Sequence, residues 1–117
     1  MKSVTHLLKR ADFLRVHKQG KKWVAKGVII QALPNEAGKT RFGLTVSKKL
    51  DKSAVGRNRM RRRLRAAASD ILSVHARPGI DFVLIGRPES ATRPYAALCE
   101  DVRWCLEKME LINPPAA

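Results

Sequence analysis

Residues 41–72 read RFGLTVSKKLDKSAVGRNRMRRRLRAAASDIL, and this stretch holds a strand, a charged connection and a long helix. At its start, Phe42, Leu44 and Val46 alternate with small or polar residues, which predicts a strand with one apolar face. The connection KKLDKSAVG has no apolar period and predicts a loop. From about Arg57 onward, apolar residues return at the spacing of an amphipathic helix. These residues are Met60, Leu64, Ala67, Ala68, Ile71 and Leu72.

The segment before this stretch predicts a helix and a strand. Apolar residues at helical spacing indicate a helix over 6–19, with Thr5 as its N-cap and Gly20 at its end. Residues 23–33 are rich in β-branched side chains and predict a strand that ends at Pro34. Only a short, turn-like segment follows, so we expect this strand to form a hairpin with the strand of residues 41–49.

The segment after the long helix predicts a buried strand and a last helix. Residues 80–86 (IDFVLIG) are apolar almost throughout, which is typical of a central strand covered on both faces. Pro94 suits the first turn of a helix, and Ser90 or Thr92 is expected to cap it. Trp104 falls opposite the apolar stripe of that helix, so it is either a half-exposed surface residue or part of a contact surface.

Together the elements predict a single-domain α-β sandwich of the α+β class, in the order α-β-β-α-β-α. A chain of 117 residues suffices for one domain with a modest core. We place this domain at residues 1–113 and expect a frayed tail over 114–117.

The charge of the chain indicates a polyanionic partner. Lysine and arginine number 24 against 10 acidic residues, which gives a net charge of +14. Such an excess favours nucleic acid first and an anionic membrane second. No apolar run approaches the ~20 residues of a membrane span, and the N-terminus does not resemble a secretory signal. The two cysteines fit neither a redox motif nor a zinc site, so we expect reduced thiols in a cytoplasmic protein.

More than half of this charge lies between residues 47 and 65, where nine basic residues and one acid give 9 − 1 = +8. On a helical wheel, Asn58, Arg59, Arg62 and Arg65 face away from the apolar stripe. Arg63 lies near one edge of the stripe. Arg57 and Arg61 lie at the other, although the position of Arg57 at the helix start should let its side chain swing outward. A helix that begins near Arg57 would crowd arginines onto its first turn, where free N–H groups attract phosphate.

The chain lacks a recognisable catalytic constellation. The three histidines are scattered, and the acids show no paired or metal-ligating spacing. Asp81, within the apolar strand, is expected to be hydrogen-bonded at a sheet end. The sequence therefore indicates a binding protein.

Three motifs resemble the bacterial ribonuclease P protein component. These are Asp12-Phe13 with Val16 and Gly20, the stretch from RFGLTVSKK to RNRMRRRLR, and DFVLIGRP at 81–88. The resemblance implies an α-β sandwich with a left-handed β-α-β crossover. It also implies a protein without catalytic or metal-binding residues of its own, which binds the ribonuclease P RNA as a monomer. In that family the RNA uses Mg²⁺ to cut the 5′ leader from precursor tRNA, and the protein contacts the leader.

The resemblance assigns roles to residues at matching positions. The RNA-contacting set is Arg57, Asn58, Arg59, Arg61, Arg62 and Arg65, with Lys48, Lys49 and Lys52 in the adjoining loop. A leader-binding cleft between the first helix and the sheet would hold Phe13, His17 and Gln31. His17 and Gln31 stand where the family often has aromatics, so stacking of leader bases should be reduced. His17 is as well suited to packing as to stacking.

Two other functions fit the composition less well. A structural RNA-binding protein, such as a ribosomal protein of similar shape, would share the charge but not the signature of 41–65. A protein-only nuclease would need an acidic or metal-binding cluster that the sequence does not show.

Overall fold

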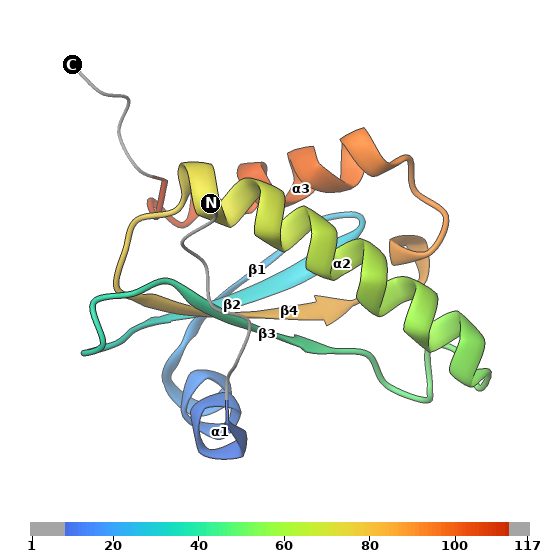
Figure 1. The fold of residues 1–117 in the computed structure, drawn as a ribbon, viewed down its shortest axis with the longest axis horizontal. Coiled ribbons are helices and arrows are strands. Elements are labelled where there is room, and N and C mark those ends of the chain that lie inside the picture. Colours follow the sequence, from blue (N-terminus) through green and yellow to red (C-terminus); the bar gives the residue numbers. More distant parts are fainter. Residues whose placement is uncertain (1–8, 113–117) are drawn as a thin grey trace.

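The computed structural model describes residues 9–112, which form three α-helices, a short 3₁₀ helix and a four-stranded sheet (Figure 1). In chain order the elements are α1 (Arg10–Gln19), β1 (Lys21–Val24), β2 (Val28–Pro34), β3 (Arg41–Thr45), α2 (Ala54–His75), β4 (Ile80–Gly86), η1 (Pro88–Ser90) and α3 (Tyr95–Lys108). The expected cap at Thr5, the start of the first helix at residue 6 and the tail at 114–117 lie outside the described residues.

The sheet separates α1 from the other two helices, as Figure 1 shows. The strand order is β1-β2-β4-β3, with β2 antiparallel to β1 and β4, and β3 parallel to β4. The main core lies between the sheet and α2 and α3, where Phe42, Ile30, Phe82, Leu64 and Leu106 are almost fully buried. The α+β class is confirmed, and β4 is the central buried strand that the apolar run at 80–86 predicted.

The region 21–34 differs from the prediction because it holds two strands instead of one. A turn at Ala25–Gly27 splits it into β1 and β2, so the order is α-β-β-β-α-β-α. At this turn the Gly27 N–H donates to the Asp101 carboxylate at 3.0 Å. A Cβ at Gly27 would lie 2.7 Å from that same carboxylate, so any larger residue would have to displace it.

The predicted hairpin between β2 and the strand at 41–45 is also wrong. The two strands are not neighbours, because β4 inserts between them and pairs with both. The only hairpin among the described strands joins β1 to β2. A short connection therefore did not indicate pairing here, since a strand about forty residues further along the chain competes for the same edges.

The connection from β3 through α2 to β4 is a parallel crossover. In Figure 1, α2 lies above the sheet, both strands run from left to right, and β4 lies behind β3. This is the left-handed arrangement, contrary to the hand found in ~98% of such units.

The helix ends differ from their predicted caps. α2 begins at Ala54, a turn before Arg57, because the Ser53 hydroxyl accepts the Gly56 N–H at 3.2 Å. No side-chain hydrogen bond caps α3, and Ser90 is used elsewhere: its hydroxyl donates to the Gly27 carbonyl at 2.6 Å. Gly20 ends α1 in an extended conformation. Glycine lets the chain pass close to the preceding turn of the helix here, since a Cβ would lie 2.5 Å from the Val16 carbonyl oxygen.

Candidate nucleic-acid interface

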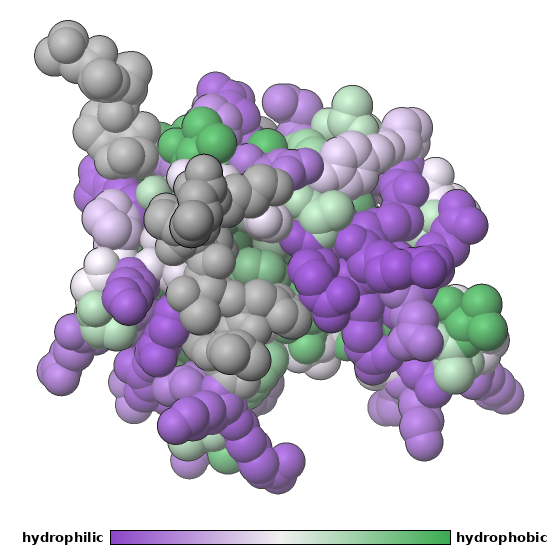
Figure 2. Space-filling model, in the orientation of Figure 1, coloured by the Kyte–Doolittle hydropathy of each residue, from purple (hydrophilic) through white to green (hydrophobic). Residues whose placement is uncertain are grey.

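The N-terminal half of α2 presents the predicted basic face. Asn58, Arg59, Arg62 and Arg65 are exposed, while Met60 and Leu64 on the other side of the helix are buried in the core. Figure 2 shows a hydrophilic surface over much of this part of α2, with a hydrophobic patch at the right where the helix begins. The outward orientation predicted from the helical wheel is confirmed for all four residues.

Two of the three arginines at the edges of the apolar stripe, Arg57 and Arg63, are half-buried and bind backbone carbonyls. Arg63 donates to the Ser90 carbonyl at 2.9 Å and also to the carbonyl of Arg93. Arg57 was expected to swing outward, but it turns back and donates to the carbonyls of Asp51 and Lys52 at 2.8 and 3.0 Å. Two of the helix's arginines therefore fasten its flanking loops and are not available to a ligand in this arrangement.

The outward Arg59 and Asn58 also have protein contacts that preset their side chains. The Arg59 guanidinium donates to the Ala91 carbonyl at 3.3 Å, which holds it against the segment that follows η1. Arg61, at the stripe edge, donates to the Asn58 side-chain oxygen at 3.1 Å. These contacts order long side chains before any ligand binds, which lowers the entropy cost of binding.

The first turn of α2 does not carry the crowded arginines that the sequence predicted. The helix starts at Ala54, so the arginines begin only at the end of that turn. The Ser53 hydroxyl accepts the Gly56 N–H, and the Asp51 carboxylate accepts the Ser53 N–H at 2.8 Å. Ser53 therefore occupies one N–H group of the first turn, and the negative charge of Asp51 lies beside the helix start, which makes this end less attractive to an anion.

The loop between β3 and α2 carries the three predicted lysines. Lys48, Lys49 and Lys52 are all exposed, and a turn in which the Leu50 N–H donates to the Ser47 carbonyl at 3.2 Å shapes the loop. The lysines therefore extend the basic surface of α2 from the end of β3 to the start of the helix.

A second candidate surface lies where α1 covers the sheet. Phe13 packs onto Gly43 of β3, where a Cβ would lie 2.3 Å from the phenyl ring. The pairing register places Gly43, Val83, Gln31 and Lys22 in one row across the four strands. Gln31 is buried in that row, whereas His17 is exposed on α1 one turn after Phe13. The structure thus places all three predicted cleft residues at the α1 side of the sheet.

The next row on this face is only partly covered. Thr45 and Val24 are exposed at its two ends, and Ile85 and Ile29 between them are half-buried. These four residues form an open floor beside α1, which the sequence analysis missed together with Lys22. Side chains alternate between the two faces along each strand, so the sequence could have identified these residues only if the strand order had been known.

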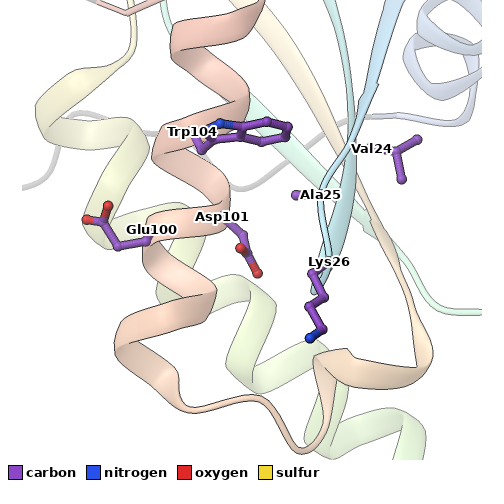
Figure 3. Close-up of a pocket in the computed structure, with 6 residues that line it drawn as sticks. All are labelled: Val24, Ala25, Lys26, Glu100, Asp101 and Trp104. Carbon is purple, nitrogen blue, oxygen red and sulfur yellow. The ribbon is translucent and has the colours of Figure 1, made fainter.

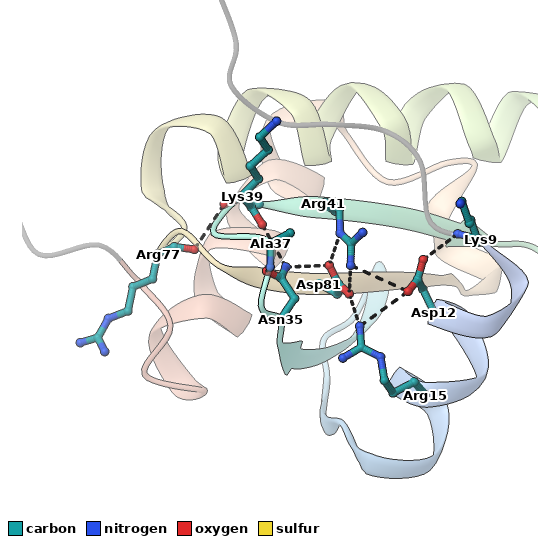
Figure 4. Close-up of polar contacts among 10 residues, drawn as sticks. Lys9, Asp12, Arg15, Asn35, Ala37, Lys39, Arg41, Arg77 and Asp81 are labelled. Atoms are coloured by element: carbon teal, nitrogen blue, oxygen red, sulfur yellow. Dashed lines mark hydrogen bonds and ion pairs between the residues drawn. The ribbon is translucent and has the colours of Figure 1, made fainter.

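Asp81 fixes the position of α1 on the sheet (Figure 4). Its carboxylate is fully buried and accepts hydrogen bonds from Arg15 of α1 at 2.6 Å, Arg41 of β3 at 2.8 Å and the Asn35 amide at 2.8 Å. The hydrogen bonds to Asp81 raise the pKa of Arg41. The prediction that Asp81 is hydrogen-bonded at a sheet end is confirmed.

The described residues contain no apparent metal centre and no membrane span. Within 9–112, no three His, Cys, Asp or Glu side chains are grouped so that they could hold a metal ion. None of the helices in that range is both long and apolar enough to cross a bilayer. Cys99 and Cys105 are both free thiols, and burial raises the pKa of Cys105 to about 12.

Known proteins are similar to this chain in both sequence and fold. Residues 1–110 match the profile of the family described as Ribonuclease P. The "Ribonuclease P protein component" of Paramagnetospirillum magneticum is 47% identical over 108 residues, which span 88% of this chain and 80% of that protein. The protein of the same name from Ruegeria pomeroyi is 43% identical over 118 residues, with coverage of 95% and 90%.

Solved structures agree with this likeness. The RNase P protein from Thermotoga maritima superposes with a TM-score of 0.75 at 25% identity, over 88% of this chain and 96% of that one. The Staphylococcus aureus RNase P protein superposes with a TM-score of 0.75 at 24% identity, over 97% of this chain and 100% of that one. At this identity the comparison shows a similar fold.

Proposed function

The chain belongs to the family of ribonuclease P protein components, and from this membership we propose how its two surfaces divide the work of that subunit. As a member, it is the protein subunit that works with the ribonuclease P RNA in processing the 5′ end of tRNA. We assign the α2 face to the catalytic RNA and the α1 side of the sheet to the 5′ leader of precursor tRNA.

The assignment of α2 rests on its exposed, pre-ordered guanidinium face. Arg59, Arg62 and Arg65 project from the side of the helix opposite the core. Arginine binds phosphate through two parallel hydrogen bonds and stacks on bases, so a row of arginines suits a folded RNA. Asn58, Arg57 and Arg61 complete the helical part of this proposed surface, and Lys48, Lys49 and Lys52 extend it along the loop. Arg57 can contact the RNA only if its guanidinium releases the hydrogen bonds to the carbonyls of Asp51 and Lys52.

The assignment of the leader rests on the open floor beside α1. A single strand lying over Thr45, Ile85, Ile29 and Val24 would have Phe13 and His17 of α1 along one side. His17 is exposed and available for stacking. Gln31 is buried, so it would offer at most a hydrogen bond at the edge of the cleft.

The chemistry of cleavage is then left to the RNA subunit. We propose that the RNA holds the Mg²⁺ ions it needs and that the protein, as a monomer on the RNA and in the cytoplasm, improves binding of the substrate.

Reconstitution tests the proposal directly. The purified chain is added to bacterial ribonuclease P RNA and precursor tRNA at low Mg²⁺, and release of the 5′ leader is followed. We expect the protein to accelerate release, and failure to do so would refute the function. Cleavage by the protein without RNA would instead favour a protein-only nuclease.

A salt titration tests the α2 surface. The logarithm of RNA affinity should fall with the logarithm of salt concentration by about 0.7–0.9 per phosphate contact. Replacing Arg59, Arg62 and Arg65 together by alanine should therefore flatten the slope by about two to three. The matched control replaces Lys39, Arg77 and Arg103, which removes the same charge elsewhere. Equal slopes for the two triple variants would refute the assignment of α2.

A further inference from the structure

The two tryptophans of the chain meet at the sheet edge formed by β1. Trp23 of β1 and Trp104 of α3 have ring centroids 6.1 Å apart at an interplanar angle of 63°. Their exposed fractions are 38% and 40%, so neither is absorbed into the core. More than a third of each residue faces solvent, so both tryptophans keep surface that a ligand can contact.

Hollows flank the pair on both sides. One, of about 400 Å³, has Trp104 on one wall and the end of β1 on the other, as Figure 3 shows. The second, of about 380 Å³, lies on the far side of Trp23. The first is lined by Val24, Ala25, Lys26, Glu100, Asp101 and Trp104, and the second by Lys21, Lys22, Trp23, Lys108, Met109 and Glu110.

The charges around the pair favour an anion. Asp101 is already bound by Arg93 at 2.5 Å, so it offers little negative charge to a ligand. The other charged residues that line the two hollows are four lysines and two glutamates, and all six are exposed. They are Lys21, Lys22, Lys26, Lys108, Glu100 and Glu110. The Lys108 ammonium lies 5.9 Å from the centre of the Trp104 ring, so a positive charge stands directly beside an aromatic surface.

We propose that the Trp23–Trp104 pair is a stacking site for an unpaired segment of RNA. Every base has a π face that stacks on an aromatic side chain, and lysines beside the ring meet the phosphates that connect the bases. A protein partner would need a wider apolar surface, but among the exposed large hydrophobic residues only Val24 adjoins the two tryptophans in these hollows.

This site is separate from the α2 face. β1 and β3 are opposite edges of the sheet, with α3 packed over β1 and β2 and α2 over β3 and β4. RNA can therefore reach the tryptophan pair while the arginines of α2 hold another segment. The proposal does not depend on the catalytic RNA and can be tested without it.

Tryptophan fluorescence reports on this pair, because the chain has no other tryptophan. The full-length protein is titrated with hexaadenylate, with hexauridylate, and with an abasic hexamer of the same charge. We expect hexaadenylate to quench the emission most, hexauridylate less, and the abasic hexamer not at all. The variant with Arg59, Arg62 and Arg65 replaced by alanine should still be quenched, since its change is at the other surface.

Two variants at the pair complete the test, with binding of labelled hexaadenylate followed by anisotropy. Trp104→Leu should weaken binding about 5-fold to 150-fold through the loss of one stacked base, whereas Trp104→Phe should keep most of the affinity. Circular dichroism confirms that both variants are folded, and Lys108→Ala gives a second reading if Trp104→Leu is not. Equal quenching by the abasic hexamer, no quenching by any oligonucleotide, or emission that changes with protein concentration would each overturn the proposal. The last outcome would indicate that a second copy of the chain covers the pair.

Discussion

Replacing Asp81 by asparagine should destabilise the protein more than the loss of any carboxylate that forms an exposed ion pair. The buried carboxylate accepts hydrogen bonds from Arg15, Arg41 and Asn35, and it alone joins α1, β3 and β4 at that end of the sheet. An asparagine has nearly the same shape but presents an NH₂ group to donors on one side. It therefore leaves at least one guanidinium without its acceptor.

The size of the effect follows from the burial of each partner. Removing one member of a buried ion pair costs about 3–5 kcal/mol. Arg15 and Arg41 keep side-chain exposures of 36% and 25%, so water can partly replace the lost acceptor. We therefore expect the free energy of unfolding to fall by about 2–3 kcal/mol, at or just below the lower limit of that range. For a domain of this size, this corresponds to a melting temperature lower by about 8–12 °C.

The matched control is Glu107→Gln, which makes the same chemical change in the exposed pair with Arg103. Both variants raise the net charge by one, so long-range repulsion changes equally. The control should lose about 0.5 kcal/mol or less. Thermal and urea unfolding of both variants, followed by circular dichroism, measure the difference. Equal stability of the two variants would refute the view that Asp81 anchors α1. Asp81→Asn should also weaken binding of leader-bearing precursor tRNA, since α1 borders the open floor.

Three further predictions concern the cleft and the core. His17→Phe should tighten binding of leader-bearing precursor tRNA without changing that of mature tRNA, as measured by filter binding; equal effects would show that residue 17 does not touch the leader. Gly43→Ala should cost about 1–3 kcal/mol in urea unfolding because its methyl group would collide with the Phe13 ring. Burial raises the pKa of Cys105 to about 12, so its thiol stays neutral and should resist alkylation in the native protein at pH 8–9. The stability that this neutral thiol contributes is present below the unfolded-state pKa of about 8.5 and should decline as the pH rises towards 12.

The elements with strong local patterns could be predicted from the sequence. The apolar spacing of Met60 and Leu64 is set by α2 alone, so a helical wheel identifies the buried side and the outward arginines. The apolar run of β4 similarly predicted a strand buried on both faces. Such features depend on residues only a few positions apart.

Features that depend on distant partners could not be predicted. β1 is exposed along its whole length, and only its pairing with β2 makes it a strand. The Arg63 side chain binds carbonyls about thirty residues away, and nothing near it in the sequence indicates this. The start of α2 was missed because Ser53 and Asp51 lie in a segment without apolar period. The open floor beside α1 required the strand order, which the wrong hairpin had obscured.

The position of β4 also has a consequence for the time course of synthesis. The two strands that border β4 precede it in the chain, and each pairs with it along an inner edge. A nascent chain that has not yet released residues 80–86 therefore lacks the strand that pairs with the inner edges of β2 and β3. The four-stranded sheet can form only when β4, the last of its strands, has emerged from the ribosome, after more than two thirds of the chain has been made. Until then the chain is exposed to strand-edge aggregation, and its strong positive charge is the feature best suited to keep nascent copies apart.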